Sequence, residues 1–236
     1  MKVEIWSDTM CPYCYIGKRK YEQALAQFPH AAEIETVWRS YLLDPDIKKG
    51  EKIPQYDYMA QLRGWSKKEA IKMHDKLTKF AQSAGLDYHF DKVLAVNTLD
   101  AHRLVHLAKQ AGLGSEAEEA LFKAFFTDGK DISDRQTLIN LGESIGLQGK
   151  QVADLLAGKD FQKEVLKECD EANQLGLDVI PFFLFNRKHI LTGSQPVEEI
   201  LEVLTIAYDE WKGVDISSDR VERSSGASCS IDGVCE

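Results

Sequence analysis

Two cysteines near the start of the chain have the spacing of a redox pair, in the order Cys11-Pro12-Tyr13-Cys14. They follow a short segment of alternating apolar and polar residues and precede a segment with helical periodicity. Free N–H groups and the dipole at a helix N-terminus favour an anion, so Cys11 is expected to be a good thiolate nucleophile near neutral pH. Two intervening residues let Cys14 close a disulfide with it. We predict that Cys11 attacks, or is attacked, through a mixed disulfide that Cys14 resolves.

The same two cysteines could instead supply half of a zinc site, which needs four ligands. The other close cysteine pair is Cys229 and Cys235, near the C-terminus. A proline inside the motif and its position between a strand and a helix favour redox chemistry over zinc. His102 and His106 lie one helical turn apart, but no carboxylate pattern accompanies them, so we expect a packing or surface role. No metal site is predicted.

Two other kinds of residue could serve the motif. Asp8 is a candidate proton relay to Cys14, although a loop aspartate is more often a turn or cap residue. Trp6, Tyr13 and Tyr15 could form an apolar rim for an unfolded substrate chain, or Trp6 could belong to the core. The lone Cys169 is expected to be a small buried apolar residue.

The pattern of apolar, capping and glycine residues predicts the strands and helices that position the motif. The opening predicts a strand, a helix and a second strand at 2–6, 12–27 and 33–43. Residues 53–175 are helical, with five or six helices, no convincing strand, and stops at Gly85, Gly112, Gly146 and Gly176. Capping boxes are expected at Ser66…Glu69, Ser115…Glu118 and Ser133…Gln136. The end predicts a strand, a turn, a return strand and a helix at 179–185, 186–188, 189–191 and 196–211.

Neither half of this strand-containing framework could bury a core alone, so one mixed sheet should combine them. We predict an α/β, thioredoxin-like domain made of residues 1–50 and 173–213, interrupted by a helical insertion at 51–172. Residues 214–236 are Ser- and Gly-rich and are expected to form a flexible tail with the second cysteine pair. Pro181 opens an apolar strand and cannot donate to a ladder, so it must lie at a strand start or edge.

The composition argues against several classes of protein. The 236 residues are 44% apolar with a formal net charge of −9, so the chain is globular and unsuited to nucleic acid or anionic membranes. No signal peptide or membrane span is apparent, and five cysteines do not suggest a secreted disulfide scaffold. We therefore expect a cytoplasmic protein, in which paired cysteines are more often catalytic, sensing or metal-binding.

Five segments of the chain carry a family resemblance, at 7–17, 97–104, 126–133, 180–183 and 191–195. They resemble the DsbA-like branch of the thioredoxin superfamily, most closely its FrnE-type cytoplasmic disulfide oxidoreductases. The resemblance implies a thioredoxin domain interrupted by a helical domain. It also implies that Pro181 is cis and lies against the cysteine pair, with Ile180 offering backbone groups to a substrate strand.

FrnE-type proteins carry a second cysteine pair with four residues between the thiols. Here five residues separate Cys229 from Cys235. Closing so short a loop contributes only about 2 kcal/mol, which suits a labile or regulatory disulfide. We hypothesise that this pair exchanges with Cys11–Cys14 or shields it; the alternative is two free thiols.

The predicted function is a thiol–disulfide oxidoreductase or isomerase acting on protein substrates, with no bound cofactor. Glutathione or a thioredoxin-type partner could recycle it. A kappa-class glutathione transferase or hydroxychromene-carboxylate isomerase shares the architecture but has Ser where Cys11 stands. A holdase with redox-sensing cysteines and a zinc-binding module remain alternatives, and Cys11→Ser would separate enzyme from holdase.

Overall fold

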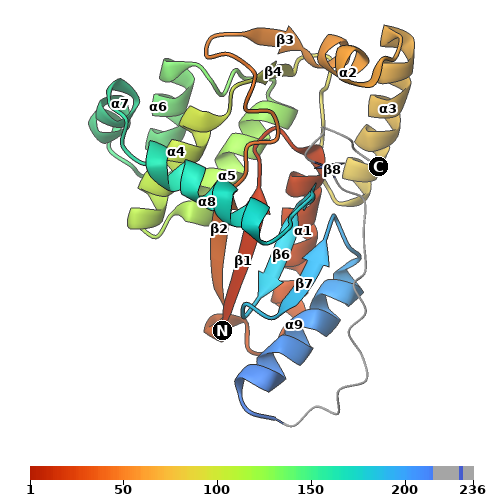
Figure 1. The fold of residues 1–236 in the computed structure, drawn as a ribbon, viewed down its shortest axis with the longest axis vertical. Coiled ribbons are helices and arrows are strands. Elements are labelled where there is room, and N and C mark those ends of the chain that lie inside the picture. Colours follow the sequence, from red (N-terminus) through yellow and green to blue (C-terminus); the bar gives the residue numbers. More distant parts are fainter. Residues whose placement is uncertain (215–228, 231–236) are drawn as a thin grey trace.

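The computed structural model describes residues 1–214 and 229–230. A four-stranded sheet occupies one end of the molecule and a group of helices the other (Figure 1). The first and last elements of the sheet domain are far apart in sequence but pack together, because the helical segment leaves the sheet and returns to it. The predicted fold class, a thioredoxin-like mixed sheet with helices inserted, is confirmed.

The sheet has the strand order β2-β1-β6-β7. Its central strand β1 (Lys2–Ser7) is parallel to β2 (Glu35–Ser40) and antiparallel to β6 (Phe182–Phe185). β6 forms an antiparallel hairpin with β7 (His189–Thr192). The front and back of the chain therefore share one sheet, and β1 brings the cysteine motif to its centre.

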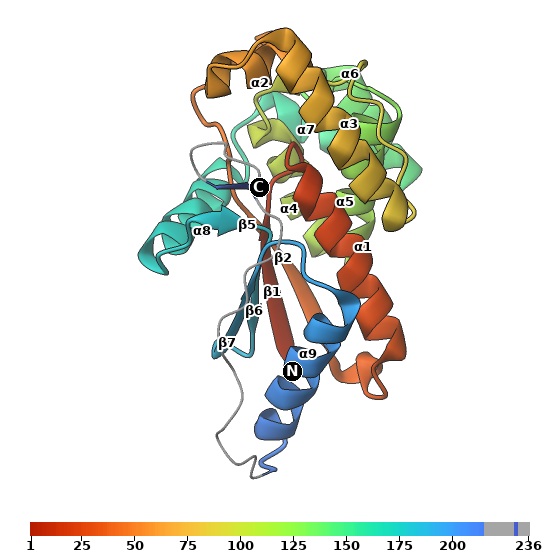
Figure 2. The same ribbon diagram turned by 90° about the vertical axis from the view of Figure 1, so that its right-hand side faces the viewer.

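Helices α1 (Pro12–Gln27) and α9 (Val197–Trp211) cover one face of the sheet (Figure 2). Val3 and Ile5 alternate along β1 with Glu4 and Trp6, and the two aliphatic residues lie in the core under these helices. That alternation is the two-residue period of a strand with two different faces. Both helices match the predicted ranges to within one residue.

The opposite face of the sheet carries a buried ionic network beneath α8 (Gln162–Gln174). Glu4 is 1% exposed and accepts hydrogen bonds from Arg39 and Arg187. Glu168 of α8 accepts from Arg39 Nη1 at 3.0 Å, which ties the helix to β2. Buried carboxylates are tolerated here because each one is paired and hydrogen-bonded.

The segment between β2 and β6 is mainly helical but also contains a small two-stranded sheet. The structure therefore corrects the prediction of no strand, since 52–54 and 94–96 pair antiparallel. Seven α-helices form in this described segment rather than five or six, together with a five-residue π-helix, η2. The elements are β3 (Lys52–Pro54), α2 (Gln55–Arg63), α3 (Lys67–Ser83), β4 (Leu94–Val96), α4 (Leu99–Gln110), α5 (Gly114–Phe122), η2 (Lys123–Thr127), α6 (Arg135–Ser144), α7 (Gly149–Ala157) and α8.

The four predicted glycine stops, Gly85, Gly112, Gly146 and Gly176, all have positive φ angles. Of the three predicted capping boxes, one is present in the structure. The box at Ser66…Glu69 is present, with both reciprocal hydrogen bonds.

The prediction at Ser115…Glu118 is wrong. α5 begins at Gly114, and the Ser115 hydroxyl accepts a hydrogen bond from Trp38 Nε1 at 3.0 Å. A buried indole needs an acceptor for its N–H, and that demand outweighs a local cap.

The prediction at Ser133…Gln136 is wrong by one residue. Asp134 caps α6 by accepting from the Thr137 N–H at 2.8 Å. Ser133 instead bonds to Asp131 through its N–H and hydroxyl.

The last described pairing lies beside the sheet. The predicted strand 179–185 is divided at Pro181 into β5 (Val179–Ile180) and β6. β5 pairs antiparallel with β8 (Cys229–Ser230), with Ile180 opposite Cys229. The segment expected to be a flexible tail thus contributes a short strand, while residues 215–228 and 231–236, including Cys235, lie outside the described residues.

Candidate active site at the start of helix α1

The cysteine motif lies at the start of α1, just after the end of β1. Cys11 is the N-cap, with an extended backbone, and Pro12 is the first residue of the helix. The Cys11 N–H donates to the Asp8 carbonyl at 3.0 Å, and the Cys14 N–H to the Cys11 carbonyl at 3.1 Å. Proline suits this position because its missing N–H would have no partner there. The local sequence thus sets Cys11 at the positive end of the helix dipole.

The Cys11 and Cys14 side chains lie together in the protein interior, and both are fully buried. The Cys11 Sγ lies 3.9 Å from the Ile180 carbonyl oxygen. Burial raises the pKa of Cys14 well above its usual value, and Cys11 raises it further. Cys14 is therefore a neutral thiol at pH 7, which suits a resolving residue that reacts only once the first sulfur is bonded.

The loop between β5 and β6 packs against the motif. The Ile180–Pro181 peptide bond is cis, the form implied by the resemblance. Gly17 of α1 permits the close approach, since a Cβ at that position would lie 2.8 Å from Pro181 Cγ. Ile180 is thus held beside Cys11 while β5 presents its backbone to a further strand, at present β8.

The helical insertion reaches into the site through Tyr88. The Tyr88 hydroxyl donates to the Pro12 carbonyl at 2.7 Å and is buried. Its ring stacks on Phe126, and both rings stack with Tyr15 of α1. Sequence reasoning missed Tyr88, because one tyrosine in a helical block carries no local signal of a contact 76 residues away.

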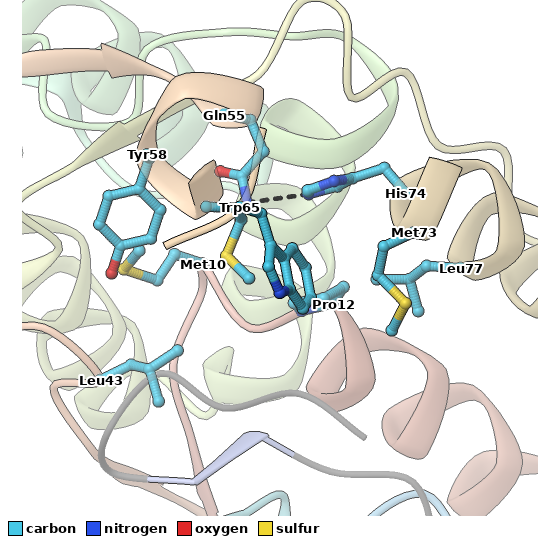
Figure 3. Close-up of a pocket in the computed structure, with 10 residues that line it drawn as sticks. Met10, Pro12, Leu43, Gln55, Tyr58, Trp65, Met73, His74 and Leu77 are labelled. Atoms are coloured by element: carbon cyan, nitrogen blue, oxygen red, sulfur yellow. Dashed lines mark hydrogen bonds between the residues drawn. The ribbon is translucent and has the colours of Figure 1, made fainter. Parts of the chain in front are cut away.

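An apolar pocket opens beside Pro12, between the motif and the α2–α3 hairpin (Figure 3). It is small, about 20 Å³, and Trp65 lies across its middle. Gln55 and His74, at the top of the view, hydrogen-bond to each other at 3.3 Å. The other residues that line the pocket are Met10, Leu43, Tyr58, Met59, Met73 and Leu77.

The aromatic residues expected to rim the site do not form a rim. Trp6, Tyr13 and Tyr15 are each less than 5% exposed, so they belong to the core. Trp6 donates its Nε1–H to the Glu168 carbonyl at 3.0 Å, and Tyr15 bonds to Glu119 at 2.7 Å. The helical insertion covers the side chains that a lone thioredoxin domain would leave exposed.

The remaining candidates have structural partners. Asp8 is fully buried and accepts from the N–H groups of Met10 and Leu43. Cys169 is half-buried, with its Sγ 3.7 Å from the Ser40 carbonyl. His106 bonds to Ser40 and Glu168. Within the described part of the chain, no three His, Cys, Asp or Glu side chains form a group that could hold a metal ion, and no helix there is long and apolar enough to cross a membrane.

The chain is similar in sequence and fold to known proteins. The chain is 34% identical to a probable DsbA oxidoreductase from Streptomyces coelicolor, whose structure matches with a TM-score of 0.85 over 100% of this chain and 98% of that one. It is 25% identical over 186 residues to the uncharacterized protein YwbO of Bacillus subtilis, which covers 77% of this chain and 85% of YwbO.

A more distant structure shares the fold. The cytosolic disulfide reductase DsbM from Pseudomonas aeruginosa, solved with GSH, has a TM-score of 0.60 at 17% identity, over 90% of this chain and 98% of that one. Residues 2–205 match the DSBA-like thioredoxin domain, a span that includes β1, the cysteine motif, the helical insertion and the Pro181 loop. This chain therefore belongs to the DSBA-like thioredoxin domain family.

Proposed function

We propose that this protein is a thiol–disulfide oxidoreductase or isomerase of the FrnE type, which exchanges disulfides with protein substrates through Cys11 and Cys14. The observation that carries the proposal is the position of Cys11. It caps a helix N-terminus, and its sulfur lies 3.9 Å from the carbonyl of Ile180, on a strand whose edge accepts a partner strand. A reactive sulfur beside a strand-binding edge suits an extended polypeptide that contains cysteine.

The exchange needs only the sulfur atoms and no bound cofactor. The Cys11 thiolate attacks a substrate disulfide, one substrate sulfur leaves as a thiolate, and a mixed disulfide forms. Cys14 then loses its proton and attacks the Cys11 sulfur, which releases the second substrate thiolate. The substrate gains two electrons, and the enzyme is left with a Cys11–Cys14 disulfide. Glutathione or a thioredoxin-type partner in the cytoplasm is the proposed reductant that restores the dithiol; the same steps in reverse oxidise a substrate.

Pro12, Tyr13, Ile180 and Pro181 are the proposed substrate-binding residues. The backbone of Ile180 would pair with the substrate strand, in the place where β8 pairs in this structure. Pro12 borders the small apolar pocket between the motif and the α2–α3 hairpin, so its proposed contribution is an apolar contact with the substrate. Tyr13 is 4% exposed, so its proposed contribution is to shape the site from beneath.

The second cysteine pair is proposed as an internal partner of the first. Cys229 lies opposite Ile180 in the β5–β8 ladder, and the Ile180 carbonyl oxygen lies 3.9 Å from the Cys11 sulfur. We propose that Cys229 and Cys235 exchange with Cys11–Cys14 or shield it. Replacing both tail cysteines by Ser should then change the redox potential and turnover; unchanged values would exclude this role.

The first experiment is an equilibrium titration of the Cys11–Cys14 pair against glutathione, with thiols counted by mass spectrometry. A reversible two-electron couple is expected. Cys14→Ser should trap a mixed disulfide with a scrambled protein substrate, and Cys11→Ser should trap none. Cys169→Ser is the matched control and should behave as the unsubstituted protein. If Cys11→Ser retains full activity toward unfolded chains, the protein is a holdase and the proposal is wrong.

A further inference from the structure

One side chain of the helical insertion, Tyr88, reaches the backbone of the cysteine motif. It lies in the connection between α3 and β4, and its hydroxyl donates to the Pro12 carbonyl oxygen at 2.7 Å. Tyr88 is 3% exposed, and a buried phenol needs a hydrogen-bond partner. The acceptor used here belongs to the first turn of α1, one residue after Cys11. The contact therefore joins the insertion to the peptide group that follows the reactive cysteine.

The π-helix η2 fixes the backbone on both sides of Tyr88. The His89 N–H donates to the Phe126 carbonyl at 2.8 Å, and the Thr127 hydroxyl donates to the Asp87 carbonyl at 2.8 Å. The Tyr88 ring also stacks on Phe126, with the ring centroids 4.6 Å apart. π-Helical turns are rare and occur frequently at functional sites. Here the turn supplies one aromatic ring and two hydrogen bonds that hold the Tyr88 hydroxyl against the motif.

The Pro12 carbonyl and the Tyr13 N–H belong to the same planar peptide group. In a helix the carbonyl of such a group points toward the C-terminus and its N–H toward the N-terminus, where Cys11 lies as the N-cap residue. The Tyr13 N–H occupies the second helical position, one of the two from which an N-cap side chain accepts a hydrogen bond. A donor on the carbonyl side polarises the peptide group and strengthens its N–H as a donor. The Tyr88 hydroxyl is thus coupled to the Cys11 sulfur through a single peptide group.

The protonation state of Cys11 determines how strongly this polarisation is felt. In the structure the Cys11 side chain makes no capping hydrogen bond, and its sulfur lies 3.9 Å from the Ile180 carbonyl oxygen, a position suited to a neutral S–H donor. A thiolate cannot donate and is repelled by a carbonyl oxygen. After losing its proton, Cys11 therefore depends on the N–H groups of the first turn of α1. The Tyr13 N–H is the earliest of these, because Pro12 has none.

We propose that Tyr88 is a positioning residue for the exchange reaction, which polarises the Pro12–Tyr13 peptide group and thereby raises the share of Cys11 that is present as the reactive thiolate. This inference rests on the proposed function. Cys11 loses its proton to solvent, the thiolate attacks the substrate disulfide, and one substrate sulfur leaves as a thiolate. Tyr88 keeps its own proton throughout and changes only the equilibrium of the first step.

The surroundings of Tyr88 keep its hydroxyl in the donor form. Burial raises the pKa of the hydroxyl well above its usual value, and Cys11 and Cys14 add to the rise. The phenol is therefore neutral at every pH at which thiol exchange is measured, and its one proton is directed at the Pro12 carbonyl. The influence of the two cysteines also places the hydroxyl within electrostatic range of both sulfur atoms.

The test measures the acidity of Cys11 by the ultraviolet absorbance of its thiolate. The full-length chain keeps Cys11 as its single thiol, and the matching Cys11→Ser chain is the blank. Tyr88→Phe should raise the midpoint of the titration by about 0.3–0.5 pH unit, or about two- to threefold in the proton equilibrium, because a neighbouring hydrogen bond strengthens the next one by about 10–30%. The substitutions in this background are Cys14→Ser, Cys169→Ser, Cys229→Ser and Cys235→Ser.

Two further chains separate polarisation from packing. Tyr21→Phe removes another buried hydroxyl from α1, one that bonds to Thr36 at 2.8 Å, and it should leave the midpoint unchanged even if stability falls. 3-Fluorotyrosine in place of Tyr88 keeps the aromatic ring and makes the hydroxyl a stronger donor, so the midpoint should move to lower pH. Opposite shifts from the two changes at this position cannot arise from a loss of packing.

The redox equilibrium gives a second measurement, in the chain that retains both cysteines of the motif. A stabilised thiolate favours the reduced protein, so Tyr88→Phe should shift the equilibrium with glutathione toward the Cys11–Cys14 disulfide by about two- to threefold. Equal midpoints in the parent chain and Tyr88→Phe, or shifts of the same sign from Tyr88→Phe and the fluorinated chain, overturn the inference. Absence of a reversible disulfide in the unsubstituted protein overturns the proposed function instead, so the two failures can be told apart.

Discussion

Glu168 holds the returning helix α8 on the sheet, and we predict that Glu168→Gln destabilises the protein by about 3 kcal/mol. The carboxylate is 6% exposed and accepts from Arg39 Nη1, the Ser40 N–H and His106 Nε2 at 3.0, 2.6 and 3.1 Å. Removing one partner of a buried ion pair costs about 3–5 kcal/mol. The lower end applies, because Arg39 keeps its bonds to Glu4.

The stability lost in Glu168→Gln should depend on pH, and the direction follows from the pKa of Glu168. Burial alone would raise the pKa of Glu168, but His106, Lys109 and the Ser40 N–H hold it well below the usual range. A carboxyl with a depressed folded-state pKa contributes stability above its unfolded pKa of about 4.3 and loses that contribution as pH falls toward the folded value. The difference between the two proteins should therefore be full at pH 7 and shrink below about pH 4.

The assay is urea denaturation at pH 7, 5 and 3, with thermal unfolding at pH 7. A loss of about 3 kcal/mol corresponds to a fall in melting temperature of about 6–12 °C for a chain of this size. Glu164→Gln, exposed on the same helix, is the control and should change stability by less than about 0.5 kcal/mol. A loss below about 1 kcal/mol for Glu168→Gln, or one that does not shrink in acid, would refute the reasoning.

Two further substitutions and one chemical modification provide additional tests. Tyr88→Phe removes the donor to the Pro12 carbonyl, and urea denaturation should show a loss of about 1–2 kcal/mol with slower disulfide exchange. Gly17→Ala places a Cβ 2.8 Å from Pro181 Cγ, so denaturation should show a loss of about 1–3 kcal/mol and turnover should fall. Cys169 should resist alkylation in the folded protein at pH 7, because burial raises its pKa to about 12, and mass spectrometry of the intact chain checks this.

The features of this structure that the sequence could predict depend on interactions between residues that are close together in the chain. The Cys11–Cys14 spacing, the proline at the helix start and the glycine stops are set by neighbouring residues, and each appears where it was expected. The two sheet halves could be predicted to join because neither could bury a core alone. Even here the structure refined the result, since Pro181 divides the predicted strand between β5 and β6.

The features that the sequence could not predict are contacts between residues far apart in the chain, which depend on how the helices pack. Tyr88 is an ordinary residue of a helical block until the fold brings its hydroxyl to 2.7 Å from the Pro12 carbonyl oxygen. Glu118 was assigned to a capping box because of its spacing from Ser115, yet burial against the sheet domain determines its environment. His102 was expected to have a packing or surface role, and only tertiary structure places it 3.4 Å from Asp8.

These long-range contacts make the helical insertion part of the candidate active site. Tyr88 fixes the carbonyl of Pro12, and Asp8 faces His102 across the boundary between the two parts of the chain. Glu168 anchors the helix that leads directly into β5, so the edge beside Cys11 is positioned by the insertion as well. The surroundings of the cysteine motif therefore come from both parts of the chain, because the sheet domain supplies the cysteines and the insertion supplies Tyr88 and His102.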